Sequence, residues 1–138
     1  MYTRILVPVD LRNTDKLGKA LGVAEEMAKE HDATIVYAGI ADAVPTSSPV
    51  TEGEKMLQEL HVFAAQKANE HGIKTSDHVA LRRDLHLNVG SEVIKAAKDT
   101  GCDIIVMASH VPGIIEHVFS SNAGYVAAHA PMSVYVVR

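Results

Sequence analysis

The chain has 138 residues, of which 47% are hydrophobic, 22% charged and 4% aromatic. This composition is ordinary for a globular protein, and it excludes a disordered, collagen-like or coiled-coil chain. With 13 Lys and Arg against 17 Asp and Glu, the formal net charge is −4, so no overall charge attracts the protein to nucleic acid or to an anionic membrane. We expect one compact domain over residues 1–138.

Two features predict a cytoplasmic protein. The single cysteine, Cys102, cannot form an internal disulfide, which favours a reducing compartment and a small buried thiol. The first apolar run, Ile5–Val9, is too short for the core of a signal peptide, and no apolar run approaches the length of a membrane span.

The chain opens with a predicted strand, helix and strand. Ile5–Val9 is apolar without alternation, which is typical of a strand buried on both faces. Apolar and small residues then recur at helical spacing, so we expect a helix capped by Asn13 or Thr14 and ending near His31. A second apolar run, Ala33–Ile40, predicts the next strand.

The middle of the chain begins with a loop at 42–49 that contains two prolines. A long amphipathic helix follows from Thr51 and stops at Gly72, before a weaker strand over Ile73–Leu81. Arg82 and Arg83 are expected to be a solvated pair, with contact to phosphate or to a partner as the alternative. The stretch Arg82–Asn88 fits a loop or a turn of helix, and its insert Asp84–Asn88 is expected either to line the cleft or to cover the sheet edge.

Two helices and two strands are predicted in the remainder of the chain. Ser91 is expected to cap the first helix, which Gly101 stops, and Ser121 or Asn122 the second, which runs through His129. The strands are expected over 103–108 and 132–137. Strands that are apolar on both faces and alternate with helices predict a three-layer α/β domain, in which helices cover both faces of a five-stranded parallel sheet.

Ligands of open α/β sheets bind beyond the carboxyl ends of the strands, where the strand order reverses. Three of the predicted strands end near Asp10, Ile40 and Ser109, and these residues line one cleft if the strand ends meet. The helix that starts near Ser121 and Asn122 offers backbone amides on which a phosphate can rest.

Three stretches resemble the universal stress protein family, and the resemblance spans essentially the whole chain: Ile5–Asp10, Asp103–His110 and Ala130–Val137. It implies strand order 3-2-1-4-5, an adenine nucleotide as ligand, and a homodimer through Val134–Val137. The physical argument for the dimer agrees, because this last apolar strand should lie at a sheet edge, and an unpaired apolar edge promotes aggregation.

The family's nucleotide-binding members carry G-x-x-G, nine residues, and then G-S or G-T. Here Ala108, Val111 and Ser120 replace the glycines, and the spacing is one residue shorter. The pattern resembles instead the F-type branch, with A-S-H-x-P followed by G-S-N, from which only Ser120 departs. Members of that branch are taken to bind adenine nucleotides. Val111 is β-branched and tolerates positive φ poorly, which disfavours a tight glycine-type phosphate loop.

The predicted ligand is ATP, with adenine near the ends of the first two strands and phosphates near the last helix. Any metal is expected to be Mg²⁺ carried by the phosphates, because no HxH or HExxH pair occurs among the eight histidines. Asp10 has an alternative role as the cap of the turn that follows it. The predicted binding residues are Pro8, Val9, Asp10, Ile40, Ala108, Ser109, His110, Val111, Ser120, Ser121 and Asn122.

These features favour a stress-response regulatory protein that binds ATP and acts as a dimeric sensor or adaptor toward an unidentified protein partner. Neither a general base nor a P-loop lysine motif is visible, so any ATP hydrolysis is expected to be slow and incidental. The alternative is a dimeric protein-interaction module of the same fold that no longer binds nucleotide, as the replaced glycines permit.

Overall fold

A five-stranded parallel sheet forms the centre of the molecule. The computed structural model describes residues 1–42, 52–82, 88–109 and 120–138. Within these residues the strands lie side by side in the order β3-β2-β1-β4-β5, which confirms the predicted order 3-2-1-4-5. The strands are β1 (Arg4–Pro8), β2 (Thr34–Asp42), β3 (Lys74–Arg82), β4 (Ile104–Ala108) and β5 (Ser133–Val137).

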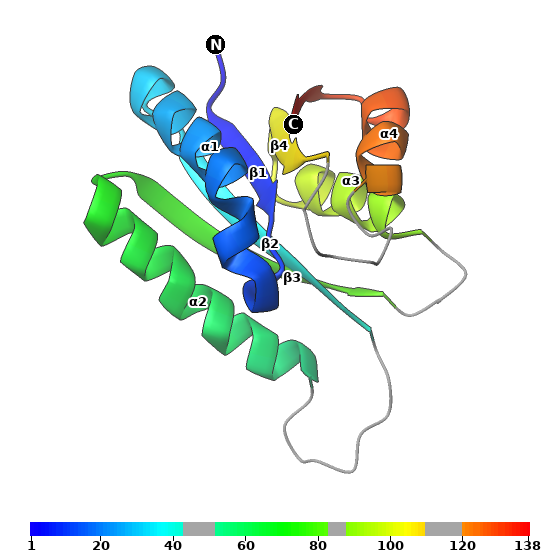
Figure 1. Ribbon diagram of the computed structural model, residues 1–138, viewed down its shortest axis with the longest axis horizontal. Coiled ribbons are helices and arrows are strands. Elements are labelled where there is room, and N and C mark those ends of the chain that lie inside the picture. Colours follow the sequence, from blue (N-terminus) through cyan, green and yellow to red (C-terminus); the bar gives the residue numbers. More distant parts are fainter. Residues whose placement is uncertain (43–51, 83–87, 110–119) are drawn as a thin grey trace.

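Helices cover both faces of the sheet, as predicted. Helices α1 and α2 lie on one face, and α3 and α4 lie on the other (Figure 1). A 3₁₀ helix, η1, joins β1 to α1. The elements are η1 (Leu11–Leu17), α1 (Gly18–His31), α2 (Glu52–His71), α3 (Val89–Asp99) and α4 (Ser120–His129).

The apolar run in β1 explains why both faces are covered. Ile5 and Val7 pack into the hydrophobic core beneath α1 and α2, whereas Leu6 between them packs into the core beneath α3 and α4. All three side chains are almost completely buried. Since burial of such a side chain stabilises the fold by roughly 1.5–3 kcal/mol, a strand that is apolar at every position requires a helical layer on each side.

The helices begin at other residues than the sequence predicts. Asp10 caps η1, and its carboxylate accepts a hydrogen bond from the Arg12 amide. Helix α1, which was expected to be capped by Asn13 or Thr14, instead follows Leu17, which forms no side-chain capping hydrogen bond. Asn88 caps α3, and its side-chain oxygen accepts from the amide of Ser91, the residue expected to be the cap. A capping side chain accepts from a backbone amide two or three residues later in the chain. The cap therefore lies before the first helical residues, which is where Asp10 and Asn88 stand.

The predicted helix stops are confirmed at Gly72 and Gly101. Each follows the end of a helix and adopts a positive φ, 64° and 69° respectively, which costs glycine least because it lacks a Cβ atom. Cys102 follows the second of these turns and is buried, as expected. Burial raises the pKa of its thiol above the ordinary value.

β5 lies at one edge of the sheet, where the sequence places it, and it pairs with β4. None of the described helices is both long and apolar enough to cross a membrane. Predictions for residues 43–51, 83–87 and 110–119 lie outside the described residues, and these include His110, Val111 and most of the Asp84–Asn88 insert.

Candidate functional site

A cleft of about 780 Å³ lies at the carboxyl ends of β1 and β2. Its volume is within the range of about 300–1,000 Å³ that is usual for small-molecule sites. The strand order explains its position, because the chain winds from β1 through β2 to β3 and then crosses to β4 on the other side of β1. An open α/β sheet leaves a crevice where the winding reverses.

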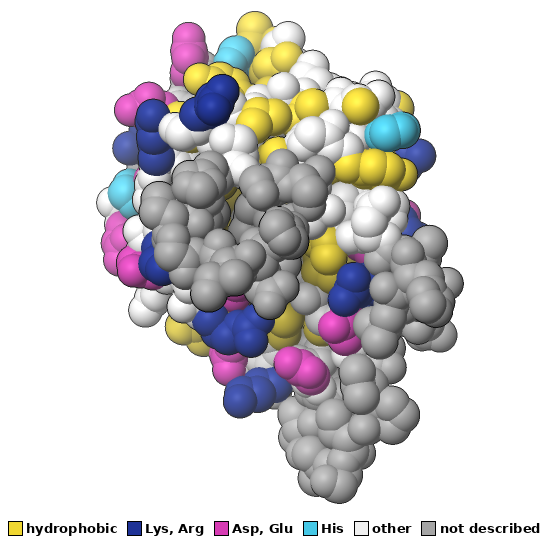
Figure 2. Space-filling view, turned by 45° about the vertical axis from the view of Figure 1, so that its right-hand side comes forward, with side chains coloured by type: hydrophobic (Ala, Val, Ile, Leu, Met, Phe, Trp, Pro, Cys, Tyr) yellow, Lys and Arg dark blue, Asp and Glu magenta, His cyan; other side chains and the backbone are white. Residues whose placement is uncertain are grey.

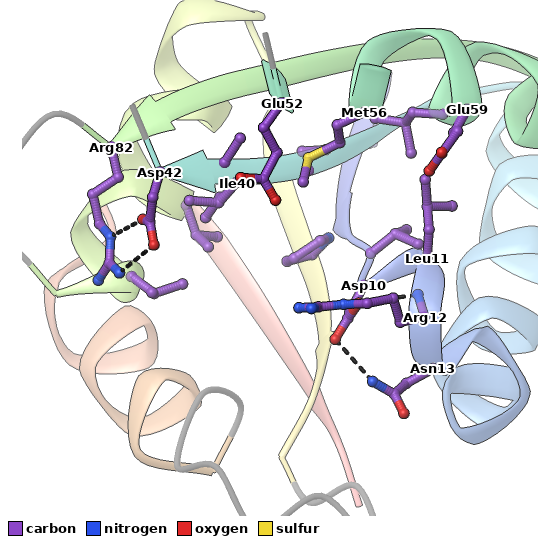
Figure 3. A pocket seen from close by; sticks show the side chains of 18 of the residues that line it. Asp10, Leu11, Arg12, Asn13, Ile40, Asp42, Glu52, Met56, Glu59 and Arg82 are labelled. Carbon is purple, nitrogen blue, oxygen red and sulfur yellow. Dashed lines mark hydrogen bonds and ion pairs between the residues drawn. The ribbon is translucent and has the colours of Figure 1, made fainter. Parts of the chain in front are cut away.

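Charged side chains of both signs surround the cleft. They come from the end of β1, the ends of β2 and β3, and the first turns of α2, as the close view in Figure 3 shows. The molecular surface outside the residues drawn in grey also shows basic and acidic side chains beside one another (Figure 2). Within the part of the chain that the structure describes, the charged lining residues are Asp10, Arg12, Asp42, Glu52, Lys55, Glu59 and Arg82.

Asp10 both lines the cleft and caps η1, so the two roles considered for it from the sequence occur together. Its Oδ1 accepts from the Arg12 amide at 3.0 Å and lies 3.4 Å from Arg12 Nε, while Oδ2 accepts from Asn13 Nδ2 at 2.9 Å. These bonds hold the carboxylate at the cleft wall. A carboxylate has about four lone-pair sites, so Asp10 keeps capacity to accept a further hydrogen bond from a ligand.

Asp42 and Arg82 form a second polar wall. Arg82 Nε donates to Asp42 Oδ1 at 2.7 Å, and Arg82 Nη2 donates to Asp42 Oδ2 at 3.2 Å. The hydrogen bond from Arg82 lowers the pKa of the Asp42 carboxyl below its usual value. The expectation of a solvated arginine pair is therefore wrong for Arg82, because strand register sets it directly beside Asp42. Arg83 lies outside the described residues.

Helix α2 contributes Met56 and Leu60 to the cleft lining, and Figure 3 shows Met56 pointing from the helix toward β2. Gly39 on β2 permits this approach, since a Cβ atom at that position would lie 2.6 Å from Met56 Sδ. The thioether and the apolar residues beneath it form a surface against which a flat ring can pack. Glu52 and Glu59 on the same helix supply carboxylates at the rim.

Asn122 reaches the cleft from the first turn of α4. Its side chain is buried, and its Oδ1 accepts a hydrogen bond from the Gly90 amide at 3.1 Å. The bond ties the start of α4 to the start of α3. Asn122 thus lies within α4 and does not cap it, because the helix already begins at Ser120.

The structure brings together part of the predicted site. Ala108 is buried in the core, and the backbone amide of Ser109 donates to the Val137 carbonyl at 2.8 Å. Neither is among the described residues that line the cleft. The backbone of Ser120 and Ser121 starts α4, whereas His110 and Val111 lie outside the described residues. The predicted residues that line the cleft are Pro8, Val9, Asp10, Ile40 and Asn122.

Several lining residues were not expected from the sequence, among them Arg12, Asn13 and the α2 side chains. For the Asp42–Arg82 pair the sequence showed only the two opposite charges, because the register that joins them belongs to the sheet. β2 and β3 pair in register along nine residues each, and opposite charges stand at their last positions, Asp42 and Arg82. The α2 contribution carried no comparable signal, since a helix's angle to the sheet is not encoded in its periodicity.

The profile described as "Universal stress protein family" matches residues 1–138. The chain belongs to the universal stress protein family. This confirms the resemblance seen in the strand motifs, while the assignment to the F-type branch stays a prediction.

Curated relatives carry the name universal stress protein G. Those of Shigella flexneri and Escherichia coli O157:H7 are each 32% identical over 154 residues and cover all of both chains. The protein of that name from Salmonella typhimurium is 29% identical with the same coverage.

Solved universal stress proteins share the fold. The UspA structure from Lactobacillus plantarum has a TM-score of 0.72 at 21% identity, covering 99% of this chain and 98% of that one. The Archaeoglobus fulgidus protein, described in complex with dAMP, has a TM-score of 0.69 at 19% identity, with the same coverage. A universal stress protein described in complex with cAMP has a TM-score of 0.70 at 15% identity, covering 99% and 97% of the two chains.

Proposed function

We propose that this universal stress protein binds an adenine nucleotide, ATP with Mg²⁺, in the cleft at the ends of β1 and β2, and acts as a dimeric cytoplasmic sensor or adaptor. One observation carries the proposal. The cleft lies where the strand order reverses, and residues that the sequence singles out for nucleotide binding line it, including Asp10, Ile40 and Asn122.

The adenine ring is proposed to lie near Val9, Asp10 and Ile40. Val9 and Met56 give the cleft apolar lining, and the Asp10 carboxylate can accept hydrogen bonds from an amino or a ribose hydroxyl group. Two fold relatives are described in complex with dAMP and cAMP, which are adenine nucleotides. Both observations support an adenine nucleotide as the ligand class.

The phosphates are proposed to lie toward the first turn of α4, at Ser120, Ser121 and Asn122, and near Ser109 to Val111. Support comes from the helix itself, since the first amides of a helix have no intrahelical acceptor and favour an anion. Mg²⁺ is proposed to arrive with the phosphates. In the described part of the chain, no group of three or more His, Cys, Asp or Glu residues is arranged to hold a metal, and nucleotide phosphates supply most ligands of a bound Mg²⁺.

The first test is the melting temperature of nucleotide-stripped protein with and without millimolar Mg-ATP. A ligand at 100 times its dissociation constant stabilises the native state by about 2.7 kcal/mol. For a domain of this size, we expect the melting temperature to rise by roughly 5–15 °C.

Ser121→Glu locates the phosphates in the same assay, because a carboxylate in the first turn of α4 repels them. We expect this variant to abolish the ATP-dependent shift. Ser91→Glu is the matched control, since it adds the same charge to the first turn of α3 outside the cleft lining. Absence of any shift in the wild-type protein contradicts the nucleotide proposal and favours the alternative, a dimeric interaction module without nucleotide.

A further inference from the structure

An anionic ligand needs a cationic partner, and among the described residues of the cleft lining three side chains carry a positive charge. These are Arg12 after β1, Lys55 on α2 and Arg82 at the end of β3. They differ in how far each charge is already committed to a neighbouring carboxylate. That difference decides which of them can serve a ligand.

The Arg82 charge is already matched. Its guanidinium holds both oxygens of Asp42, at 2.7 and 3.2 Å. A bidentate arginine–carboxylate pair is among the stronger polar contacts in proteins. If Arg82 turned to a phosphate, the Asp42 carboxylate would remain unpaired in the same cleft and would repel that phosphate.

Lys55 stands between acidic residues of its own helix. Glu52 precedes it by three positions and Glu59 follows it by four, and both line the cleft as well. Side chains at these spacings are neighbours on a helix surface. The local charge on this part of α2 is therefore net negative, which disfavours a phosphate.

Arg12 has the least committed charge. Its Nε lies 3.4 Å from Asp10 Oδ1, at the long limit of a hydrogen bond, and its side chain is 90% exposed. Among the described residues, Asp10 is its only polar partner. Figure 3 shows the side chain leaving η1 and extending into the cleft. Its remaining donors form a planar fork that matches two phosphate oxygens.

We propose that Arg12 is a specificity-determining residue that binds the anionic group of the ligand, so that the site favours a phosphorylated nucleotide over the uncharged nucleoside. This inference rests on the proposed function. It assigns part of the phosphate binding to Arg12, a side chain that lies outside the glycine motif of the family's nucleotide-binding members. It also gives this chain a cation for the phosphates, where glycines of the family motif are replaced by Ala108, Val111 and Ser120.

The test is calorimetric titration of the full chain with ATP, adenosine and sodium tripolyphosphate. In Arg12→Gln the backbone amide that Asp10 caps remains, so urea unfolding is expected to match the wild type. We expect ATP and tripolyphosphate to bind roughly 10- to 100-fold more weakly, as for loss of a hydrogen bond to a charged group, with adenosine affinity unchanged. Lys16→Gln removes the same charge from the same element outside the cleft lining, and is expected to bind like the wild type.

The three ligands separate failure of this inference from failure of the proposed function. Equal ATP affinity in wild type and Arg12→Gln overturns the role of Arg12, as does an equal loss for adenosine, which would indicate a structural role through Asp10. Tripolyphosphate binding that depends on Arg12, without adenosine or ATP binding, supports the anion site and contradicts the adenine site. A wild-type protein that binds none of the three ligands overturns both.

Discussion

Asp103 joins the first residues of the chain to β4. Its carboxylate accepts hydrogen bonds from the Thr3 amide, the Thr3 hydroxyl and the Arg4 amide, at 2.9 to 3.2 Å. Burial raises the pKa of this carboxyl, but the hydrogen bonds from Thr3 and Arg4 together outweigh burial and lower it below its usual value. The charged form of Asp103 is therefore the one that stabilises the fold.

We predict that Asp103→Asn lowers the free energy of unfolding at pH 7 by about 1 kcal/mol, since hydrogen bonds to a charged group become ordinary ones in a partly solvated place. A carboxyl whose pKa is lower in the folded state stabilises the protein above its unfolded pKa, and this contribution is lost as pH falls through the folded pKa. The difference between variant and wild type in urea unfolding should therefore shrink below about pH 4.

Asp15→Asn is the control for this experiment, because Asp15 is exposed and forms no described ion pair or hydrogen bond. Its effect on stability should be small at both pH values. A loss in Asp103→Asn that persists undiminished at pH 3 would show that the carboxylate charge is not the source of the stabilisation.

At the scale of elements, helices α3 and α4 approach closely through a glycine. A Cβ atom on Gly90 would lie 2.8 Å from Tyr125 Cδ1 and 3.3 Å from Tyr125 Cβ. The Gly90 amide also donates to Asn122, which lines the cleft, so the contact between α3 and α4 at Gly90 fixes the position of Asn122. Closer packing than an alanine allows is the physical reason for glycine in the first turn of α3.

We predict that Gly90→Ala destabilises the fold by roughly 1–3 kcal/mol, the usual range for a side chain forced into a packed contact. Gly22→Ala is the matched control in the middle of α1, where no atom lies within 4 Å of the added Cβ. That substitution should stabilise by roughly 0.5–1 kcal/mol, because alanine favours a helix interior. Urea unfolding measures both, and equal changes in the two variants would contradict the proposed packing role of Gly90.

At the scale of the whole molecule, β5 forms one edge of the sheet. It pairs with β4 along one edge, while Tyr135 is 46% exposed. An apolar edge strand is an aggregation risk unless another strand or element covers it. A second copy of β5 related by a two-fold axis meets that need, which is the dimer of the proposed function.

Analytical ultracentrifugation tests this dimer. We predict that the wild-type protein sediments with twice the mass of one chain and that Tyr135→Glu sediments as a monomer. The substitution places two like charges at a symmetric strand pair at little cost to the folded monomer, because the side chain is partly exposed. Val62→Glu on α2 is the control, since Val62 is 57% exposed and lies outside β5; this variant should remain dimeric. A monomeric wild type contradicts the proposed assembly.

Local patterns in the sequence were sufficient for the fold class. Apolar runs such as Ile5–Val9 indicate strands buried on both faces, and periodic apolar residues indicate the helices between them. Both patterns involve only residues within one element, so they can be recognised without knowledge of the rest of the chain. The helix stops at Gly72 and Gly101 are local in the same sense, as are the positions of Asp10 and Ile40 near the ends of the first two strands.

The remainder of the site was decided by packing between elements. The Asp42–Arg82 pair joins residues 40 positions apart, and the Asn122–Gly90 bond joins residues 32 apart. Arg12 lines the cleft because the Asp10 cap starts η1 directly at the end of β1. Such contacts depend on strand register, helix angle and the exact start of a helix. These are set by the sum of many side-chain contacts across the fold, and no single stretch of sequence contains them.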